Sequence, residues 1–103
     1  MVVKTIKSKY LKYAERELCA LLRLKNTHSD SIVQVIDAYM NDTSPVIVFE
    51  ELFEAKTFDY LTYYNQLDIP KIKLYFKKLF YALYVSHSKG VMHLDLKPAN
   101  IIY

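Results

Sequence analysis

Residues 93–100, which read His-Leu-Asp-Leu-Lys-Pro-Ala-Asn, constrain this chain more than any other stretch. They place a carboxylate (Asp95), an ammonium group (Lys97) and an amide (Asn100) within six positions, directly after a turn signal at residues 89–90. Apolar residues alternate with these polar ones and can anchor the loop while its polar side chains face one small target. A polar loop between two strands would explain a single Asp or Asn, but it does not explain the complete spacing.

The hydrophobic pattern of the remaining sequence predicts an α+β fold. Strands are expected at residues 1–6, 32–40 and 45–49, with a turn at 41–44, and two short strands at 91–92 and 101–102. A polar loop is expected at 26–31. Helices are expected at 10–24 with Ser8 as cap, at 57–61 with Thr57 as cap, and from Pro70 to a stop at Gly90. We interpret the aromatic stripe of the last helix as core.

Composition restricts the class of protein further. The single cysteine, Cys19, cannot form an internal disulfide and fits a reducing compartment, so we expect an intracellular protein of the nucleus or cytoplasm. The net charge of +3 is mild and does not indicate a nucleic-acid partner. No apolar run approaches the ~20 residues of a membrane span, so no membrane partner is expected. Gly90 is the only glycine, which excludes a glycine-rich phosphate loop within these 103 residues.

The segment at 93–100 resembles the catalytic loop of eukaryotic protein kinases, H-R-D-L-K-P-x-N, with Leu94 in place of the arginine. The resemblance implies that Asp95 accepts the proton of the substrate hydroxyl, that Lys97 stabilises the γ-phosphate and that Asn100 holds Mg²⁺. The Lys-Pro pair is typical of serine/threonine kinases. The implied function is therefore transfer of the ATP γ-phosphate to Ser or Thr hydroxyls of a protein substrate.

The N-terminal half extends this resemblance. Lys4, in a Val-Val-Lys sequence, resembles the strand lysine that holds the α- and β-phosphates of ATP, and Glu17 lies thirteen residues later, as does the helical glutamate that pairs with this lysine. The alternative is that Glu15 and Glu17 are surface charges with helical partners, which contribute only ~0.3–0.5 kcal/mol.

Residues 48–52 resemble the hinge that contacts adenine. The resemblance implies that Phe49 occupies the gatekeeper position and that the carbonyl of Glu50 and the amide of Leu52 meet the adenine edge. Ile102 would form the floor of the same pocket. Because main-chain groups make the hinge contacts, the identity of the side chains at these positions is only a weak indicator of a hinge.

The resemblance covers all 103 residues and implies a partial kinase domain, with 1–49 in the N-lobe, 50–52 as hinge and 53–103 as the start of the C-lobe. A complete kinase domain has on the order of 250 residues, near the limit of a single core. The glycine-rich loop would precede Met1, and the D-F-G segment that binds Mg²⁺ would follow Tyr103.

Casein kinase II and the cell-division-control kinases that trigger replication origins are the most similar groups. Both prefer acidic substrate sites, which suits the basic residues Lys7, Lys9, Lys12 and Arg16. A regulatory subunit is a further expected partner.

A second hypothesis is a catalytically inactive remnant or pseudokinase that binds a partner. Leu94 supports it, since the family's arginine pairs with an activation-loop phosphate and leucine has no donor. A kinase with this leucine would be constitutively poised or inactive. The flanking nucleotide sequence would distinguish the two hypotheses.

Overall fold

A computed structural model of the chain describes residues 1–25 and 30–103. These residues form two compact units, Met1–Leu52 and Phe53–Tyr103. Residues 26–29 belong to the loop predicted at 26–31, so most of that loop lies outside the described residues. None of the helices within the described ranges has the length and apolar character needed to cross a membrane. The assignment of 1–49, 50–52 and 53–103 to lobes and hinge stays a prediction.

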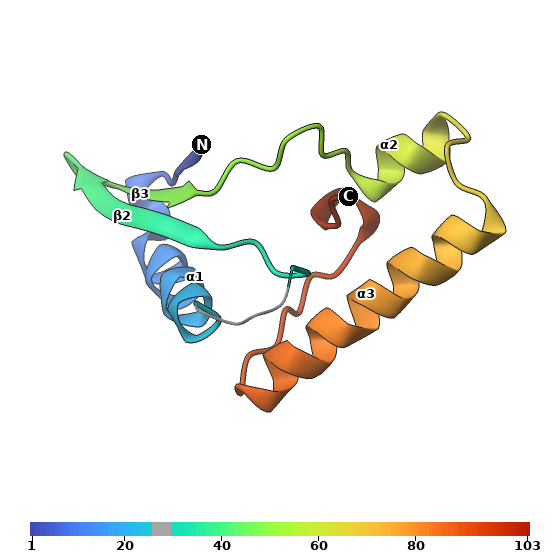
Figure 1. Ribbon diagram of the computed structural model, residues 1–103. Coiled ribbons are helices and arrows are strands. Elements are labelled where there is room, and N and C mark those ends of the chain that lie inside the picture. The colour runs from blue at the N-terminus through green and yellow to red at the C-terminus, as the bar shows by residue number, and fades with distance from the viewer. Residues whose placement is uncertain (26–29) are drawn as a thin grey trace. The chain divides into compact units, whose positions relative to one another are not determined.

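The first unit contains a three-stranded antiparallel sheet, which Figure 1 shows beside helix α1. Its strands are β1 (Val2–Thr5), β2 (Val35–Asn41) and β3 (Ser44–Phe49), in the spatial order β1-β3-β2. The central strand carries the core, because Val46, Ile47 and Val48 are all buried. Burial of three consecutive β-branched side chains stabilises the sheet by roughly 1.5–3 kcal/mol each.

The β2–β3 hairpin differs in its bounds from the prediction. Its turn contains only Asp42 and Thr43, and Asp42 has a φ of 54°, a conformation that Asp tolerates better than most residues. The strand predicted from residue 32 begins instead at Val35. The physical reason is that the partner strand β3 ends at Phe49, which pairs with Val35, so residues 32–34 have no partner on β3.

Helix α1 (Leu11–Arg23) follows a short 3₁₀ turn, η1 (Ser8–Tyr10). The prediction of Ser8 as the helix cap is wrong. Ser8 opens the 3₁₀ turn, in which the Tyr10 N–H donates to the Lys7 carbonyl at 2.9 Å, and α1 begins after Tyr10 without a side-chain cap. The helix buries Ala14, which is 3% exposed.

The second unit contains α2 (Phe58–Tyr63), α3 (Ile69–Ser88) and a 3₁₀ turn, η2 (Pro98–Asn100). The predicted cap of α2 is confirmed, because Thr57 Oγ1 accepts from the Tyr60 N–H at 3.3 Å. Asp68 caps α3 by accepting from the Lys71 N–H at 2.9 Å, and Pro70 lies in the first turn as predicted.

The end of α3 is also confirmed. Gly90 has a φ of 75°, a left-handed conformation that costs glycine little. The Gly90 N–H donates to the His87 carbonyl at 3.0 Å, and the Val91 N–H donates to the Ser86 carbonyl at 2.9 Å. These two bonds form a Schellman motif, which satisfies the last carbonyls of the helix and directs the chain into the loop at 93–100.

Three predictions for the second unit differ from the structure. Residues 91–92 form no strand, because the described residues offer them no partner strand, and the strand predicted at 101–102 is reduced to one bridge between Ile102 and Thr57. The aromatic stripe of α3 is not core within this unit, since Phe76 is 42% and Phe80 is 65% exposed. Periodicity identifies the apolar face of a helix, but burial also requires another element to cover it.

Candidate active site

The loop after α3 holds Asp95 by its main chain. The Asp95 N–H donates to Nδ1 of His93 at 3.1 Å, and Nδ2 of Asn100 donates to the Asp95 carbonyl oxygen at 2.9 Å. Asn100 also approaches the Asp95 carboxylate, with Nδ2 at 3.5 Å from Oδ2. Both main-chain hydrogen-bonding groups of Asp95 are therefore occupied, and its carboxylate points outward with 70% of the side chain exposed.

Leu94 has a backbone conformation that leucine rarely adopts. Its φ is 65°, in the left-handed region, which costs a residue with a Cβ atom roughly 1–2 kcal/mol. Leu94 is 86% exposed, so contacts of its side chain do not repay this cost. The chain bends at this residue, between His93 and Asp95.

The charged groups of the loop lie close together. Lys97 Nζ is 3.4 Å from Oδ2 of Asp95, and 54% of the Lys97 side chain is exposed. An ion pair this open to solvent contributes only about 0–1 kcal/mol to stability. The pair instead leaves a carboxylate and an ammonium group side by side and available to a bound molecule.

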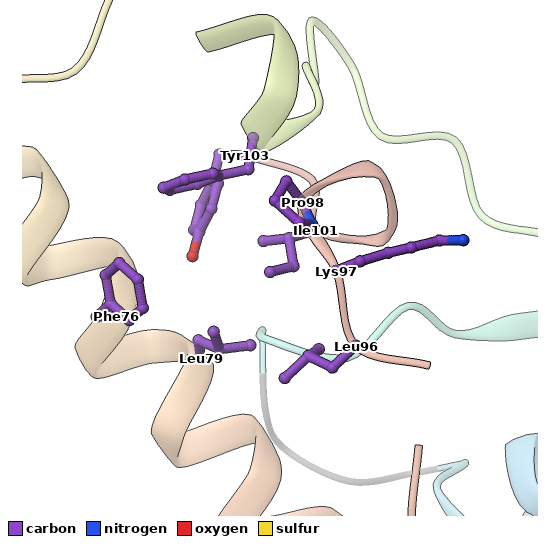
Figure 2. Close-up of a pocket in the computed structure, with 8 residues that line it drawn as sticks. Phe76, Leu79, Leu96, Lys97, Pro98, Ile101 and Tyr103 are labelled. Carbon is purple, nitrogen blue, oxygen red and sulfur yellow. The ribbon is translucent and has the colours of Figure 1, made fainter. Parts of the chain in front are cut away.

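An apolar pocket of about 220 Å³ lies beside the loop (Figure 2). Figure 2 shows the Lys97 side chain pointing away from the apolar side chains of this pocket. The lining comes from α2, α3 and the loop and consists of Phe58, Phe76, Leu79, Leu96, Lys97, Pro98, Ile101 and Tyr103. Leu96 and Ile101 thus anchor the loop by their side chains while the polar residues between them face outward.

Tyr103 fixes the far end of the loop. Its N–H and carbonyl exchange hydrogen bonds with Lys56 at 2.8 and 2.7 Å, its hydroxyl donates to the Tyr75 carbonyl at 2.8 Å, and its ring stacks on Tyr75 with centroids 3.9 Å apart. Burial, and secondarily the nearby Tyr75 phenol, raises the pKa of Tyr103 above its usual value. The hydroxyl therefore stays protonated and remains a donor.

In the first unit, Lys4 on β1 reaches Glu17 on α1. The Nζ atom lies 2.7 Å from Oε1 and 3.0 Å from Oε2, so the ammonium group bridges both carboxylate oxygens. The side chains are 50% and 37% exposed. The structure thus contains the contact expected of these residues, whereas their role in binding ATP stays a prediction.

The remaining residues predicted to contact adenine have main-chain positions that the structure defines. Phe49 ends β3, where it pairs with both Val2 and Val35. The Glu50 N–H donates to the Gln34 carbonyl at 3.1 Å. Leu52 and Ile102 are 38% and 43% exposed. Their contact with adenine stays a prediction.

Sequence reasoning missed His93 as part of this site. The only sequence signal for this role of His93 is its spacing from Asp95. A side-chain acceptor can accept a hydrogen bond from the N–H two residues later, as the side chains of Asp and Asn commonly do. Histidine is not usually expected in that role. The left-handed conformation of Leu94, between His93 and Asp95, could not be predicted either, because leucine rarely adopts it.

Asn100 offers this site an oxygen ligand for a hard cation. Mg²⁺ prefers oxygen ligands, and the Oδ1 atom of Asn100 contacts no donor among the described residues, since its amide nitrogen makes the bond to Asp95. Asn100 thus fits the role of one Mg²⁺ ligand. Within residues 1–25 and 30–103 no group of three or more His, Cys, Asp or Glu residues could hold a metal ion.

Comparison with known proteins identifies the class to which this fold and loop belong. The family model described as the protein kinase domain matches residues 1–103. The chain belongs to this protein kinase family, whose members phosphorylate proteins and generally use ATP with Mg²⁺. Its partial α+β fold is that of the family, as the sequence predicted.

Several curated relatives are protein kinases. The chain is 36% identical over 103 residues to casein kinase II subunit alpha′ of Saccharomyces cerevisiae, covering 98% of this chain and 29% of the relative. It is 31% identical over 101 residues to calcium-dependent protein kinase 5 of Plasmodium falciparum, covering 98% and 18%. It is 29% identical over 99 residues to CBL-interacting serine/threonine-protein kinase 9 of Arabidopsis thaliana, covering 96% and 22%. The chain spans less than a third of each relative.

Proposed function

We propose that this chain provides the catalytic loop and part of the ATP site of a serine/threonine protein kinase. The observation that carries the proposal is the arrangement of Asp95, whose carboxylate is exposed beside Lys97 while its main chain is held on both sides. Phosphoryl transfer depends mainly on positioning and on neutralisation of charge, and this loop has groups for both.

Each residue of the loop has a distinct role in the proposed reaction. The Asp95 carboxylate accepts the proton from the attacking hydroxyl and directs the oxygen toward the γ-phosphorus. Lys97 places a positive charge beside the transferred phosphate. Asn100 offers its Oδ1 atom to Mg²⁺, which neutralises phosphate charge when it is bound.

The first unit would bind the nucleotide. Lys4, oriented by Glu17, would contact the α- and β-phosphates. The adenine would be held by main-chain groups of Glu50 and Leu52, with Phe49 at the back of its pocket and Ile102 as its floor.

The proposed substrate is a protein with acidic residues near the phosphorylated Ser or Thr. Four exposed basic residues, one directly before η1, one on η1 and two on α1, support this preference by charge complementarity: Lys7, Lys9, Lys12 and Arg16. A regulatory subunit is a further proposed partner, and the nucleus or cytoplasm is the proposed location.

A hybrid protein tests this function. Residues 1–103 would replace the segment that they match in the yeast casein kinase II subunit alpha′, so that the relative provides the remainder of the catalytic domain. We expect the hybrid to transfer labelled phosphate from ATP to a serine peptide with acidic flanks, and to prefer it to a peptide with neutral flanks. Loss of the general base through Asp95→Asn should reduce the rate by about 10²–10⁴-fold while nucleotide binding survives.

The second candidate function is a partner-binding module without catalysis. It is favoured by the exposed aromatic face of α3, where Phe80 is 65% and Tyr84 is 71% exposed. In that case the hybrid would fold and bind nucleotide weakly or not at all, and Asp95→Asn would change nothing. A folded hybrid with no phosphotransfer above the Asp95→Asn background would reject the kinase proposal.

A further inference from the structure

Strand β2 has a free edge. It lies at one side of the sheet, in the order β1-β3-β2, so among the described residues another strand faces it on one side only. The Ile6 N–H donates to the Pro45 carbonyl at 2.9 Å, so the main-chain groups of Pro45 point toward the β1 side of β3. Main-chain directions alternate along an antiparallel pair, and Met40, the partner of Pro45, therefore has its N–H and carbonyl on the free edge. The same holds for Ala38, two residues earlier.

The composition of this edge favours pairing with another strand. Val35–Asn41 contains no glycine or proline and a single charged residue, Asp37. Three of its apolar side chains are half exposed or more: Ile36, Tyr39 and Met40. A segment with high β-propensity and little charge on an open edge is a general site of association. The simplest partner is β2 of a second copy, since two identical edges can pair antiparallel about a twofold axis.

The side chain of Asp37 occupies a main-chain donor on this edge. Its Oδ1 atom accepts from the Ala38 N–H at 2.8 Å, so that this outward donor already has an acceptor within its own strand. A second strand could bond to the Ala38 N–H only by displacing the carboxylate, and an ionised acceptor makes a stronger hydrogen bond than a carbonyl does. The register shift between Val35 and Asp37 adds to this effect, since an irregular edge is a poorer template for another strand.

We propose that Asp37 prevents the free edge of β2 from pairing with the same edge of a second copy. The carboxylate acts by occupying the Ala38 N–H, which a carbonyl of the second copy would otherwise accept. An acceptor at position 37, rather than negative charge in the strand, is therefore what keeps this edge unpaired. The inference concerns self-association of the chain and does not depend on the proposed kinase function.

The unmodified chain provides the first test, by amide hydrogen exchange. Ala38 and Met40 both direct their N–H groups to the free edge, and Ala38 has in addition the Asp37 carboxylate as its acceptor. After correction for the intrinsic rates of the two residues, we expect Ala38 to exchange roughly two- to tenfold more slowly than Met40, the factor for the net contribution of one hydrogen bond. Equal corrected rates would overturn the proposal.

Sedimentation equilibrium of two variants tests the consequence for association. Asp37→Ala frees the Ala38 N–H, whereas Asp37→Asn removes the charge but keeps an Oδ1 acceptor. We expect the association constant of Asp37→Ala to rise roughly 4- to 100-fold, because each of the two copies contributes the factor of one hydrogen bond. In Asp37→Asn it should rise by no more than about threefold, since its neutral acceptor still occupies the donor. Equal association constants in the two variants would reject the role of the acceptor.

Two further variants locate the association on β2. Asp30→Ala removes an exposed carboxylate outside the sheet and should associate as the wild type does. In Asp37→Ala/Met40→Pro the proline removes an outward N–H and leaves the bonds to β3 intact, so the association constant should return to about the wild-type value. If Asp37→Ala associates no more than Asp30→Ala, or if the proline does not reverse the gain, the proposal fails. Circular dichroism monitors the fold, and should Asp37→Ala lose its sheet, the exchange rates of the unmodified chain decide.

Discussion

Lys4 Nζ lies 2.7 Å from Oε1 of Glu17 and 3.0 Å from Oε2, although half of the lysine side chain remains exposed. The contact joins the edge strand β1 to helix α1 across thirteen residues. Water and salt screen an ion pair in this position, so its geometry is better suited to orienting the ammonium group than to stabilising the fold.

We therefore expect Glu17→Gln to lower the free energy of unfolding of the first unit by only about 0.2–1 kcal/mol. A double-mutant cycle with Lys4→Met, measured by urea unfolding at low and high salt, would isolate the interaction of the pair. Glu15→Gln, on the same helix, is the matched control and should show no coupling to Lys4. A coupling well above 1 kcal/mol that persists in high salt would contradict this prediction.

The bond from Asn100 to the Asp95 carbonyl leads to a second prediction. Asn100→Ala removes the donor, and we expect a loss of about 0.5–1.5 kcal/mol in the stability of the second unit. Asn100→Asp should lose at least as much, because it has no amide donor and adds a carboxylate near that of Asp95. Urea unfolding measures both variants. Wild-type stability in Asn100→Asp would show that the amide does not hold the loop.

The sequence predicted much of the site because its signals are local. The spacing of Asp95, Lys97 and Asn100 depends on no other element, and Thr57 and Gly90 mark helix ends through the hydrogen-bonding and backbone preferences of single residues. These interactions act within a few positions of the chain, so the sequence contains all the information that they require.

Predictions that depended on distant partners were less accurate. The start of β2 is set by the end of β3, and residues 91–92 form no strand because they lack a partner among the described residues. The exposure of Phe80 likewise depends on what covers α3, which its periodicity does not encode. The role of His93 was missed because it depends on the conformation of Leu94, which leucine does not indicate.

Tyr103 leads to a prediction about alkaline pH. Because burial raises its folded pKa above the unfolded value of about 10, the folded chain binds this proton more tightly than the unfolded chain does. The resulting stabilisation is complete below pH ~10 and is lost as the pH rises through the folded pKa. Thermal unfolding between pH 8 and 11 should therefore show a decline that is smaller in Tyr103→Phe.

The same variant removes the hydroxyl bond to the Tyr75 carbonyl, so at neutral pH it should be about 0.5–1.5 kcal/mol less stable than wild type. Tyr81→Phe, which removes a hydroxyl from an exposed tyrosine, is the control and should preserve the wild-type pH profile. An identical alkaline decline in wild type and Tyr103→Phe would show that Tyr103 does not contribute to it.

The final prediction concerns the backbone at Leu94. Asparagine tolerates the left-handed region better than leucine, and 86% exposure means that little apolar contact is lost, so Leu94→Asn should stabilise the second unit by about 1 kcal/mol. Leu94→Val should destabilise it, because a β-branched residue is poorly accommodated at positive φ. Urea unfolding monitored by circular dichroism would measure both.

Leu94→Arg distinguishes backbone strain from side-chain chemistry. Arginine has a Cβ atom and meets the same steric cost as leucine, so its stability should match that of wild type, even though it introduces the donor that kinase catalytic loops have at this position. Met92→Asn is the control, since Met92 is 67% exposed but does not have a positive φ, and it should bring no gain. If Leu94→Asn and Met92→Asn change stability equally, the left-handed conformation at Leu94 is not a source of strain.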